Sequence, residues 1–342
     1  MSPPTAAPTW PIPDLDSAGV AIAGKVVVVG SFNVDHAWRC MELPAPGATL
    51  AGEYRSGPGG KGFNQAVAAA RAGAATTFVC ALGDDPGGEL ARSLASQDGI
   101  DLRAHRSGER TGTAGIFVDA RGRNSIVIGA GANADLTVAF VESHAASLAT
   151  AAVVMAQLES PADSIVRALA LARQGGATTI LNPAPANAAT TPELLRAADV
   201  LVPNETEFAA MLARHCEVAL SPDAVATTDD LHLHALCRQL QPSATMVVTL
   251  GAAGSFVSHP EGATRGDAGS HYRIPAETVA VVDTTGAGDA FNGALAAAMA
   301  GPDAPVAAHV RFAGRYASLS TETAGAAVAM PLRAAVAARF HG

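Results

Sequence analysis

The residues with the clearest chemical potential lie near the C-terminus, in residues 282–291, which read Val-Asp-Thr-Thr-Gly-Ala-Gly-Asp-Ala-Phe. The apolar spacing of Phe291, Leu295 and Met299 predicts that a helix begins within this run. Backbone N–H groups at a helix N-terminus bind anions, and the helix dipole favours the negative charge. Asp289 would lie in the first turn beside that anion, where a carboxylate can accept a proton as a general base. The alternative is that Asp289 caps the helix and the glycines form a tight turn.

A second glycine-rich run covers residues 56–66 and contains Lys61. It does not match the P-loop of nucleotide-binding proteins, because no glycine stands five residues before Gly60-Lys61 and Gly62 follows the lysine where that motif has Ser or Thr. Residues 30–33 begin with glycine but do not continue as a dinucleotide-binding GxGxxG pattern. The sequence therefore gives little support to a dehydrogenase.

Polar side chains follow two of the expected strands. Asp35 can accept hydrogen bonds from two hydroxyls, and Asn33 can both donate and accept. Glu159 follows another strand, at the edge where open parallel sheets bind ligands. Each has a simpler alternative: Asp35 forms a turn, Asn64 caps a helix, and Glu159 favours the N-terminus of the helix that starts at Pro161.

Short β-branched runs alternate with helical patterns along the chain. The expected strands cover residues 25–30, 77–82, 152–158, 178–181, 200–202 and 246–250. The expected helices cover residues 66–72, 161–175, 206–214 and 231–240. This alternation predicts βαβ units and an α/β fold whose mainly parallel sheet is covered by helices on both faces.

Other segments depart from this alternation. Residues 36–58 are rich in proline and turns, and residues 111–128 have the pattern of a β-hairpin. We expect these two segments to form a lid beside the ligand. Residues 217–230 are predicted to be a surface insertion, and the proline-rich residues 1–23 a flexible extension outside the fold.

Composition excludes several classes of function. The 342 residues are 49% hydrophobic, enough for a sizeable core, and the net charge is −9 with scattered basic residues, which disfavours nucleic-acid binding. No apolar run reaches the roughly 20 residues that span a bilayer. The N-terminus has no secretory pattern. The four cysteines lie far apart and are expected to be reduced thiols of a cytoplasmic protein; they are Cys40, Cys80, Cys216 and Cys237.

The two glycine-rich runs together resemble the two signatures of the ribokinase-like (PfkB) family of carbohydrate kinases. Residues 283–289 are similar to the C-terminal signature and residues 56–66 to the other one. Further blocks occur in the family's order, at residues 30–35, 157–161, 182–185, 203–207 and 249–254. The resemblance extends from about residue 25 to about residue 332.

The resemblance implies a three-layer ribokinase-like fold and a single kinase domain over residues 24–342, with lid segments at about 36–58 and 108–130. It implies ATP-dependent phosphorylation of a sugar hydroxyl. Within the family, the combination of Asn33, Asp35 and Glu159 favours D-ribose, which would become D-ribose 5-phosphate. A nucleoside kinase or another sugar kinase of the family is the alternative. A sugar sensor without catalysis is a different class, and the retained Asp289 and its glycines argue against it.

The resemblance also assigns site residues. The sugar site would comprise Asn33, Asp35, Gly60, Lys61, Asn64, Glu159 and Asp289, with Asp289 as the catalytic base. The ATP site would comprise Asn204, Thr249, Gly251, Gly254, Gly288 and Gly314. The anion hole for the γ-phosphate would be formed by the N–H groups of Gly286, Ala287 and Gly288. Asn204 and Glu207 also have the spacing of a helix capping box.

Two metal ions are implied by the same resemblance. Mg²⁺ would accompany ATP, with Glu207 in the water network around it. A monovalent cation, K⁺, would bind at Asp283, Thr285, Ser320, Thr323, Gly325 and Ala329. Ala329 stands where a related protein has Ser, which predicts a weaker cation site, and Gly314 stands where some members place a larger residue against adenine. The exposed strand edges of a lid predict a homodimer.

Overall fold

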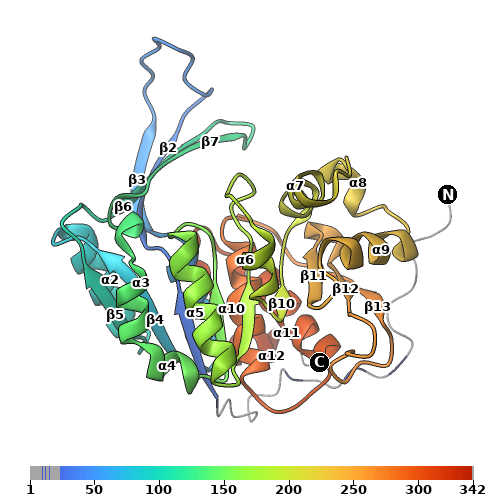
Figure 1. Cartoon of the computed structure of the whole chain (residues 1–342). Helices are drawn as coiled ribbons and strands as arrows, with labels where there is room; N and C mark the ends of the chain where they lie inside the picture. The colour runs from blue at the N-terminus through green and yellow to red at the C-terminus, as the bar shows by residue number, and fades with distance from the viewer. Residues whose placement is uncertain (1–9, 11, 13–14, 16–23, 341–342) are drawn as a thin grey trace.

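The computed structural model describes residues 10, 12, 15 and 24–340. Its largest element is a nine-stranded sheet with the strand order β13-β12-β11-β10-β9-β8-β1-β4-β5 (Figure 1). Pairing is parallel from β11 to β5, whereas β12 and β13 are antiparallel additions at one edge. The strands are β1 Lys25–Val29, β4 Ala75–Leu82, β5 Asp101–Arg106, β8 Val153–Ala156, β9 Thr178–Leu181, β10 Val200–Leu201, β11 Thr245–Thr249, β12 Ser255–Ser258 and β13 His271–Ile274.

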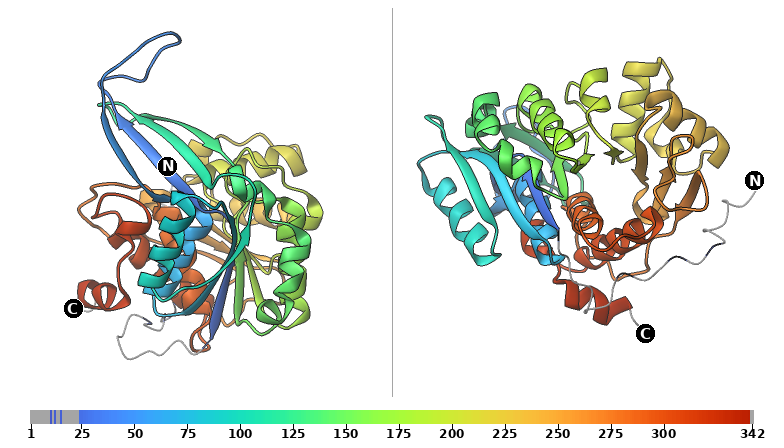
Figure 2. Two further views of the ribbon diagram at one scale, coloured as in Figure 1. Left: turned by 90° about the vertical axis from the view of Figure 1, so that its left-hand side faces the viewer. Right: turned by 60° about the horizontal axis from the view of Figure 1, so that its bottom comes forward.

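Helices cover both faces of this sheet (Figure 2). One face carries α1 Lys61–Arg71, α2 Pro86–Gln97, α10 Ala287–Met299, α11 Val306–Ser320 and α12 Arg333–Phe340. The opposite face carries α3 Val138–Ser143, α4 Ala145–Ala149, α5 Ala162–Gln174, α6 Pro192–Arg196, α7 Glu205–Cys216, α8 Pro222–Val225 and α9 Asp230–Leu240. Short 3-10 turns are η1 Gly131–Asp135, η2 Gly251–Ala253 and η3 Ala327–Ala329.

Strand β1 shows why two cores form. Its valines alternate, so that Val26 and Val28 pack into one cluster of buried side chains and Val27 and Val29 into the other. All four are completely buried. A run of adjacent valines is therefore the pattern of a central parallel strand covered on both sides.

A second sheet of four strands, in the order β3-β2-β6-β7, projects from the main body (Figure 1). We call it the small sheet. Its strands are β2 Asn33–Arg39, β3 Glu53–Gly59, β6 Gly112–Val118 and β7 Asn124–Gly129. Large apolar side chains are exposed on it, including Tyr54, Ile126, Val127 and Ile128.

The structure confirms the predicted α/β class, the mainly parallel sheet and the second, smaller sheet. Every strand and helix expected from the alternation is present, and the hairpin expected within residues 111–128 is β6–β7. The four cysteines are free thiols; Cys80 and Cys237 are buried and the other two half-buried. In the described part of the chain, no helix has the length and apolar character needed to traverse a bilayer.

Two predicted segments differ from expectation. Trp10, Ile12 and Leu15 belong to the expected extension, yet they contact the core, and the Ile12 carbonyl accepts a hydrogen bond from Arg311 at 3.0 Å. The other residues of 1–23 lie outside the described part of the chain. The insertion at residues 217–230 contains the one-turn helix α8, whose Val225 is completely buried. Val218, Leu220 and Ala226 are partly buried against the same core, so a few apolar residues without a regular period anchor this segment.

Candidate active site

The candidate site lies where the carboxyl ends of the parallel strands meet the N-termini of α1 and α10. Strand β1 leads to Asn33, β8 to Glu159, β10 to Asn204 and β11 ends at Thr249. Ligands of open α/β sheets bind at this edge, because the loops after successive parallel strands converge there.

Asp289 occupies the first turn of α10, and its carboxylate is buried with 7% of the residue exposed. Asn64 Nδ2 donates to its Oδ2 and Gln65 Nε2 to its Oδ1, both at 2.9 Å. Burial raises the pKa of Asp289, whereas the charge of Lys61 and these two hydrogen bonds act against the rise. A carboxylate with a raised pKa and two amide donors is suited to hold and release a proton.

Lys61 is the cation among the acidic groups of this site. Burial acts to lower the pKa of its ammonium, but the charges of Asp289, Glu159 and Glu207 outweigh burial and the net pKa is raised. The Lys61 backbone N–H donates to Glu159 Oε2 at 2.9 Å, and Ser31 Oγ donates to the same oxygen at 2.6 Å. Glu159 therefore binds the N-terminus of α1, where the helix dipole favours a carboxylate.

Asn33 and Asp35 point from alternate positions of β2 to one face of the small sheet. Asn33 is 2% exposed, and its Oδ1 accepts a hydrogen bond from Asn133 Nδ2 at 2.8 Å. Burial raises the pKa of Asp35 to about 7, with further increases from the charges of Glu159 and Asp289. Gly60 begins α1 with φ 87°, and a Cβ there would lie 2.8 Å from the Asn33 nitrogen, so only glycine fits.

A cavity of about 170 Å³ opens beside Asp289. Residues predicted from sequence line part of it, namely Lys61, Asn204, Glu207, Thr249, Gly286, Gly288 and Asp289. The rest of the lining is Asn182, Ala184, Val202 and Asn292. The glycine run and Asp289 at the start of α10, Lys61 of α1, and Asn204 and Glu207 at the start of α7 are thus brought to one cavity.

The predicted capping box is present at the start of α7. Asn204 Oδ1 accepts from the Glu207 N–H at 2.8 Å, and Glu207 Oε2 accepts from the Asn204 N–H at 2.9 Å. Burial raises the pKa of Glu207, while this cap and the charge of Lys61 act against the rise. Glu207 thus caps α7 through Oε2 and also lines the cavity.

The loop before α10 is shaped by glycine. Gly286 has φ 76°, and a Cβ there would lie 2.9 Å from Ala326 Cα. Asp283 Oδ1 accepts from the Thr285 N–H at 2.9 Å, and Asp283 Oδ2 accepts from the Gly325 N–H at 2.9 Å. Burial acts to raise the pKa of Asp283, but these hydrogen bonds outweigh it and the net pKa is lowered. The carboxylate is thus held in its charged form between the two loops.

Many predicted site residues do not line this cavity. Five of them belong to the predicted sugar site: Asn33, Asp35, Gly60, Asn64 and Glu159. The others belong to the predicted ATP, anion-hole and cation sites: Gly251, Gly254, Gly314, Ala287, Asp283, Thr285, Ser320, Thr323, Gly325 and Ala329. Gly251 and Gly254 bracket η2 with positive φ angles of 51° and 90°. Gly314 lies in α11, and a Cβ there would meet open space. Ser320 ends α11, and its hydroxyl donates to the Ala317 carbonyl at 2.7 Å.

Four positioning side chains were not predicted as site residues. Gln65, Asn182 and Asn133 are buried and hydrogen-bonded to predicted residues or to one another, and Asn292 Nδ2 donates to the Gly288 carbonyl at 2.9 Å. Gln65 directly follows Asn64 and Asn292 stands one turn after Gly288, so proximity in sequence was the available signal. Asn182 begins the block at residues 182–185 that resembles the family, although it was not assigned to the site, and Asn133 has no such signal.

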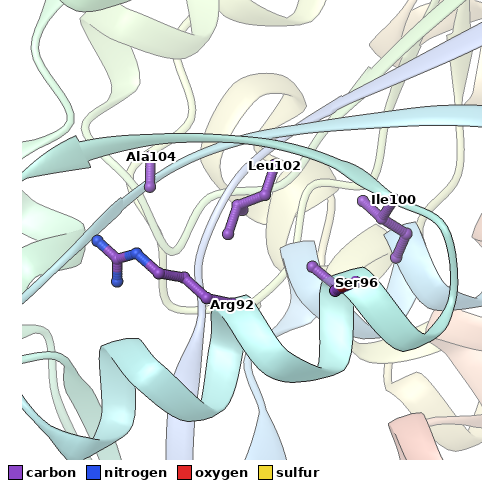
Figure 3. Close-up of a pocket in the computed structure, with 6 residues that line it drawn as sticks. Arg92, Ser96, Ile100, Leu102 and Ala104 are labelled. Atoms are coloured by element: carbon purple, nitrogen blue, oxygen red, sulfur yellow. The ribbon is translucent and has the colours of Figure 1, made fainter.

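A larger cavity of about 420 Å³ lies elsewhere, between α2 and β5 (Figure 3). It is lined by Arg92, its one charged side chain, by Ser96 and by four apolar residues. We assign the chemistry to the smaller cavity, because a reaction site needs convergent polar and titratable groups rather than volume.

Comparison with known proteins agrees with this geometry. The family model for pfkB family carbohydrate kinases matches residues 23–333. The chain is 36% identical over 311 residues to a ribokinase of Haemophilus influenzae, covering 90% of this chain and 95% of that protein. It is 36% identical to a bifunctional ribokinase/ribose-5-phosphate isomerase A of Fructilactobacillus sanfranciscensis, covering 91% of this chain but only 55% of that protein.

A solved structure extends the comparison to three dimensions. The structure of an Arabidopsis thaliana ribokinase complexed with ribose and ATP superposes with a TM-score of 0.78 and 29% identity, covering 92% of this chain and 97% of that one. The sequence match, the fold and the carboxylate beside the glycine loop agree, and the chain belongs to the pfkB family of carbohydrate kinases.

Proposed function

We propose that the protein transfers the γ-phosphoryl group of ATP to the terminal hydroxyl of D-ribose, giving D-ribose 5-phosphate and ADP. One observation carries the proposal most directly: the buried Asp289 carboxylate stands in the first turn of α10, lines a cavity with Gly286 and Gly288, and faces Lys61. Similarity to ribokinases over most of the chain supports ribose as the sugar.

The groups fall into roles that phosphoryl transfer requires. Asp289 would accept the proton of the attacking hydroxyl, held in place by its amide donors. The N–H groups of Gly286, Ala287 and Gly288 would stabilise the negative charge that develops on the transferring phosphoryl group. Lys61 would add a positive charge beside the same oxygens.

Sugar recognition would rest on Asn33, Asp35, Asn64 and Glu159. Asp35 offers two carboxylate oxygens to neighbouring hydroxyls, and Asn64 Oδ1 is buried with no hydrogen-bond partner among the described residues. Such an oxygen costs free energy unless a ligand donates to it. Glu159, which follows β8, is held by its hydrogen bond from the Lys61 N–H at the start of α1. There it would meet the anomeric end of the sugar. A nucleoside carries its base at that position, so this carboxylate favours a free sugar over a nucleoside.

The nucleotide phosphates and the divalent ion would occupy the cavity beside Asp289, which Asn204, Glu207 and Thr249 line. Asn204, Thr249, Gly251 and Gly254 would contact the phosphates and ribose of ATP, and Gly314 would lie on the adenine side. Within the described residues, no group of three or more His, Cys, Asp or Glu is arranged to hold a metal ion. Glu207 alone would reach the hydration shell of Mg²⁺, which neutralises phosphate charge when it arrives with ATP.

A monovalent cation would bind between the loops around Asp283. The 282–286 and 320–329 segments are joined by hydrogen bonds from the Val282 and Asp283 N–H groups to the Thr321 carbonyl, at 2.8 and 3.0 Å. Asp283 together with backbone carbonyls of Thr285, Ser320, Thr323, Gly325 and Ala329 would hold K⁺. Bound there, K⁺ supplies fixed positive charge next to the anion hole. Ala329 has no side-chain oxygen, which favours weak binding.

The small sheet would serve as the lid over the sugar and as a dimer interface. Ile126, Val127 and Ile128 are 51%, 67% and 46% exposed on β7, an edge strand. Consecutive exposed apolar residues on an unpaired edge favour association with a second copy. Val127→Asp should convert a dimer to a monomer in light scattering after size exclusion, and a wild-type protein that is monomeric at micromolar concentration would contradict the assignment.

The proposed reaction is tested by ADP release from ATP with D-ribose, 2-deoxy-D-ribose, other pentoses, hexoses and adenosine at equal concentrations. We expect D-ribose to give the highest kcat/KM, with the product identified as the 5-phosphate by NMR. Glu159→Gln keeps the shape of the side chain and removes its charge. It should reduce the ratio of kcat/KM for ribose to kcat/KM for adenosine. A higher kcat/KM for adenosine than for any free sugar would overturn the assignment in favour of a nucleoside kinase.

A further inference from the structure

Gln65 contacts the proposed base but is not itself part of the substrate cavity. It is completely buried, whereas its neighbour Asn64 is 6% exposed and keeps an unpartnered Oδ1. The two residues donate to different oxygens of Asp289, Asn64 to Oδ2 and Gln65 to Oδ1. Asn64 can serve both the base and the sugar, while Gln65 serves the base alone.

The packing of α1 against α10 explains how Gln65 reaches Asp289. A Cβ at Gly293 would lie 2.4 Å from the Gln65 carbonyl and 2.5 Å from Ala68 Cβ. Because Gly293 lacks that atom, the helices approach closely, and a side chain of α1 can span to the first turn of α10. Gln65 and Asp289 are 224 positions apart in the chain.

Every polar atom of the Gln65 side chain is engaged. Its Nε2 donates to Asn182 Oδ1 at 3.1 Å as well as to Asp289, and its Oε1 accepts from Gln157 Nε2. Asn182 is anchored in turn, because its Nδ2 donates to the Val202 carbonyl at 2.8 Å. Gln157 and Asn182 follow β8 and β9, so the rigid sheet fixes the orientation of the Gln65 amide.

We propose that Gln65 is a positioning residue, which fixes the orientation of the Asp289 carboxylate and keeps it ionised through the hydrogen bond to Oδ1. The inference rests on the proposed role of Asp289 as base. The amide N–H forms a stronger hydrogen bond to an ionised carboxylate oxygen than to an oxygen of the neutral acid, so it stabilises the carboxylate over the carboxylic acid. It also restrains rotation, which directs the remaining lone pairs toward the cavity.

Other charged groups face Asp289 and set the background for this effect. Lys61 on α1 favours the carboxylate form, and Glu159, after β8, opposes it. Asp35 on β2 and Glu207 on α7 also interact electrostatically with Asp289. These four groups remain in place when Gln65 is replaced, so a change in the titration of Asp289 reports the lost hydrogen bond.

The test is the pH profile of kcat in Gln65→Met, which keeps the length of the side chain and removes its donor. We expect the acid limb of kcat to move up by about one to two pH units, because a hydrogen bond to a charged group favours ionisation about 10- to 100-fold. On the acid side of the shifted limb, activity should fall by a similar factor, and it should approach the wild-type value at higher pH. The KM of sugar and of ATP should change less than about threefold. Gln97→Met, the same replacement on the exposed face of α2, is the control and should match wild type.

Two results would overturn the inference: an acid limb unchanged in Gln65→Met, or a kcat lowered by one factor at all pH values. If Gln65→Met does not fold, Gln65→Leu, which also removes the donor without adding a charge, carries the same test. The effect of Gln65→Met should vanish in an Asp289→Asn background. Full activity of Asp289→Asn alone would instead refute the proposed base.

Discussion

Asp35 should make sugar binding depend on pH near neutrality. Its carboxylate packs against Gly59, where a Cβ would lie 2.2 Å from either oxygen, and close to two other acidic residues. Burial, with the charges of Glu159 and Asp289, raises the pKa of Asp35 from 3.8 to about 7. Because the proposed role is to accept hydrogen bonds from sugar hydroxyls, the ionised form should bind the sugar more tightly.

The size of the effect follows from a single proton. Below pH 7 the dissociation constant of ribose should rise up to about tenfold per pH unit, so that it is roughly 30-fold larger at pH 5.5 than at pH 8. Asp35→Asn cannot ionise, so its dissociation constant should be flat across this range. At pH 8 it should bind ribose about 10- to 150-fold more weakly than wild type, as expected for a lost charged hydrogen bond of about 1.5–3 kcal/mol.

The same pKa predicts an effect on stability of opposite sign. The pKa in the fold lies above the unfolded value, so the fold retains a proton between about pH 4 and pH 7. The associated stability is complete below the unfolded pKa and is lost as the pH rises through about 7. The loss is at most about 4 kcal/mol, and less with screening by solvent. Asp35→Asn should therefore be more stable than wild type at pH 8.

Both effects can be measured without turnover. Titration calorimetry of ribose from pH 5.5 to 8 gives the binding profile, and urea unfolding at pH 5 and pH 8 gives the stability difference. A wild-type dissociation constant that is the same at pH 5.5 and pH 8 would refute the reasoning. So would an Asp35→Asn protein that is less stable than wild type at pH 8.

Three further predictions use other parts of the structure. Gly286→Ala places a Cβ 2.9 Å from Ala326 at a positive φ, so turnover should fall by about 10²–10³-fold as the anion-hole N–H groups shift; near-normal steady-state turnover would argue against that loop as the anion hole. K⁺ should raise activity above that in NaCl or choline chloride at equal ionic strength, and Asp283→Ala should abolish the difference; identical wild-type rates in all three salts would exclude the cation site. Phe63 is 1% exposed in the core. Phe63→Ala should lower the free energy of unfolding by about 3–5 kcal/mol in urea titrations. A loss under about 1 kcal/mol would contradict this and would mean that neighbouring core side chains fill the space left by the phenyl ring.

Much of the fold could be predicted because its signals are local. The valines of β1 and the glycines before α10 indicate structure within a few residues of themselves. Helices α2, α11 and α12 and strand β5 are among the elements that were not predicted. The signals of the last two are weak: α12 has only two buried residues, and β5 has exposed and half-buried side chains at a sheet edge. Such edge elements are set by packing against neighbours rather than by a strong internal pattern.

The residues of the candidate site also differ in whether a local sequence pattern predicts them. Asp289 and Lys61 stand in motifs whose spacing has a chemical meaning, so the sequence alone points to them. The hydrogen bond from Ser31 to Glu159 spans 128 positions of the chain, and the one from Asn133 to Asn33 spans 100. No local sequence pattern predicts that these residues pair. These contacts depend on which strand ends the sheet places side by side. The supporting amides around the base therefore become visible only in three dimensions.

The most direct test of the account is single-turnover phosphoryl transfer by Asp289→Asn. The substitution keeps the shape of the side chain and removes the base, so the rate of ribose 5-phosphate formation, measured by rapid quench with saturating ATP and ribose, should fall by about 10²–10⁴-fold. ATP binding, measured by calorimetry on the same preparation, should be close to that of wild type. A transfer rate within a few-fold of wild type would contradict the assignment of Asp289 as the general base.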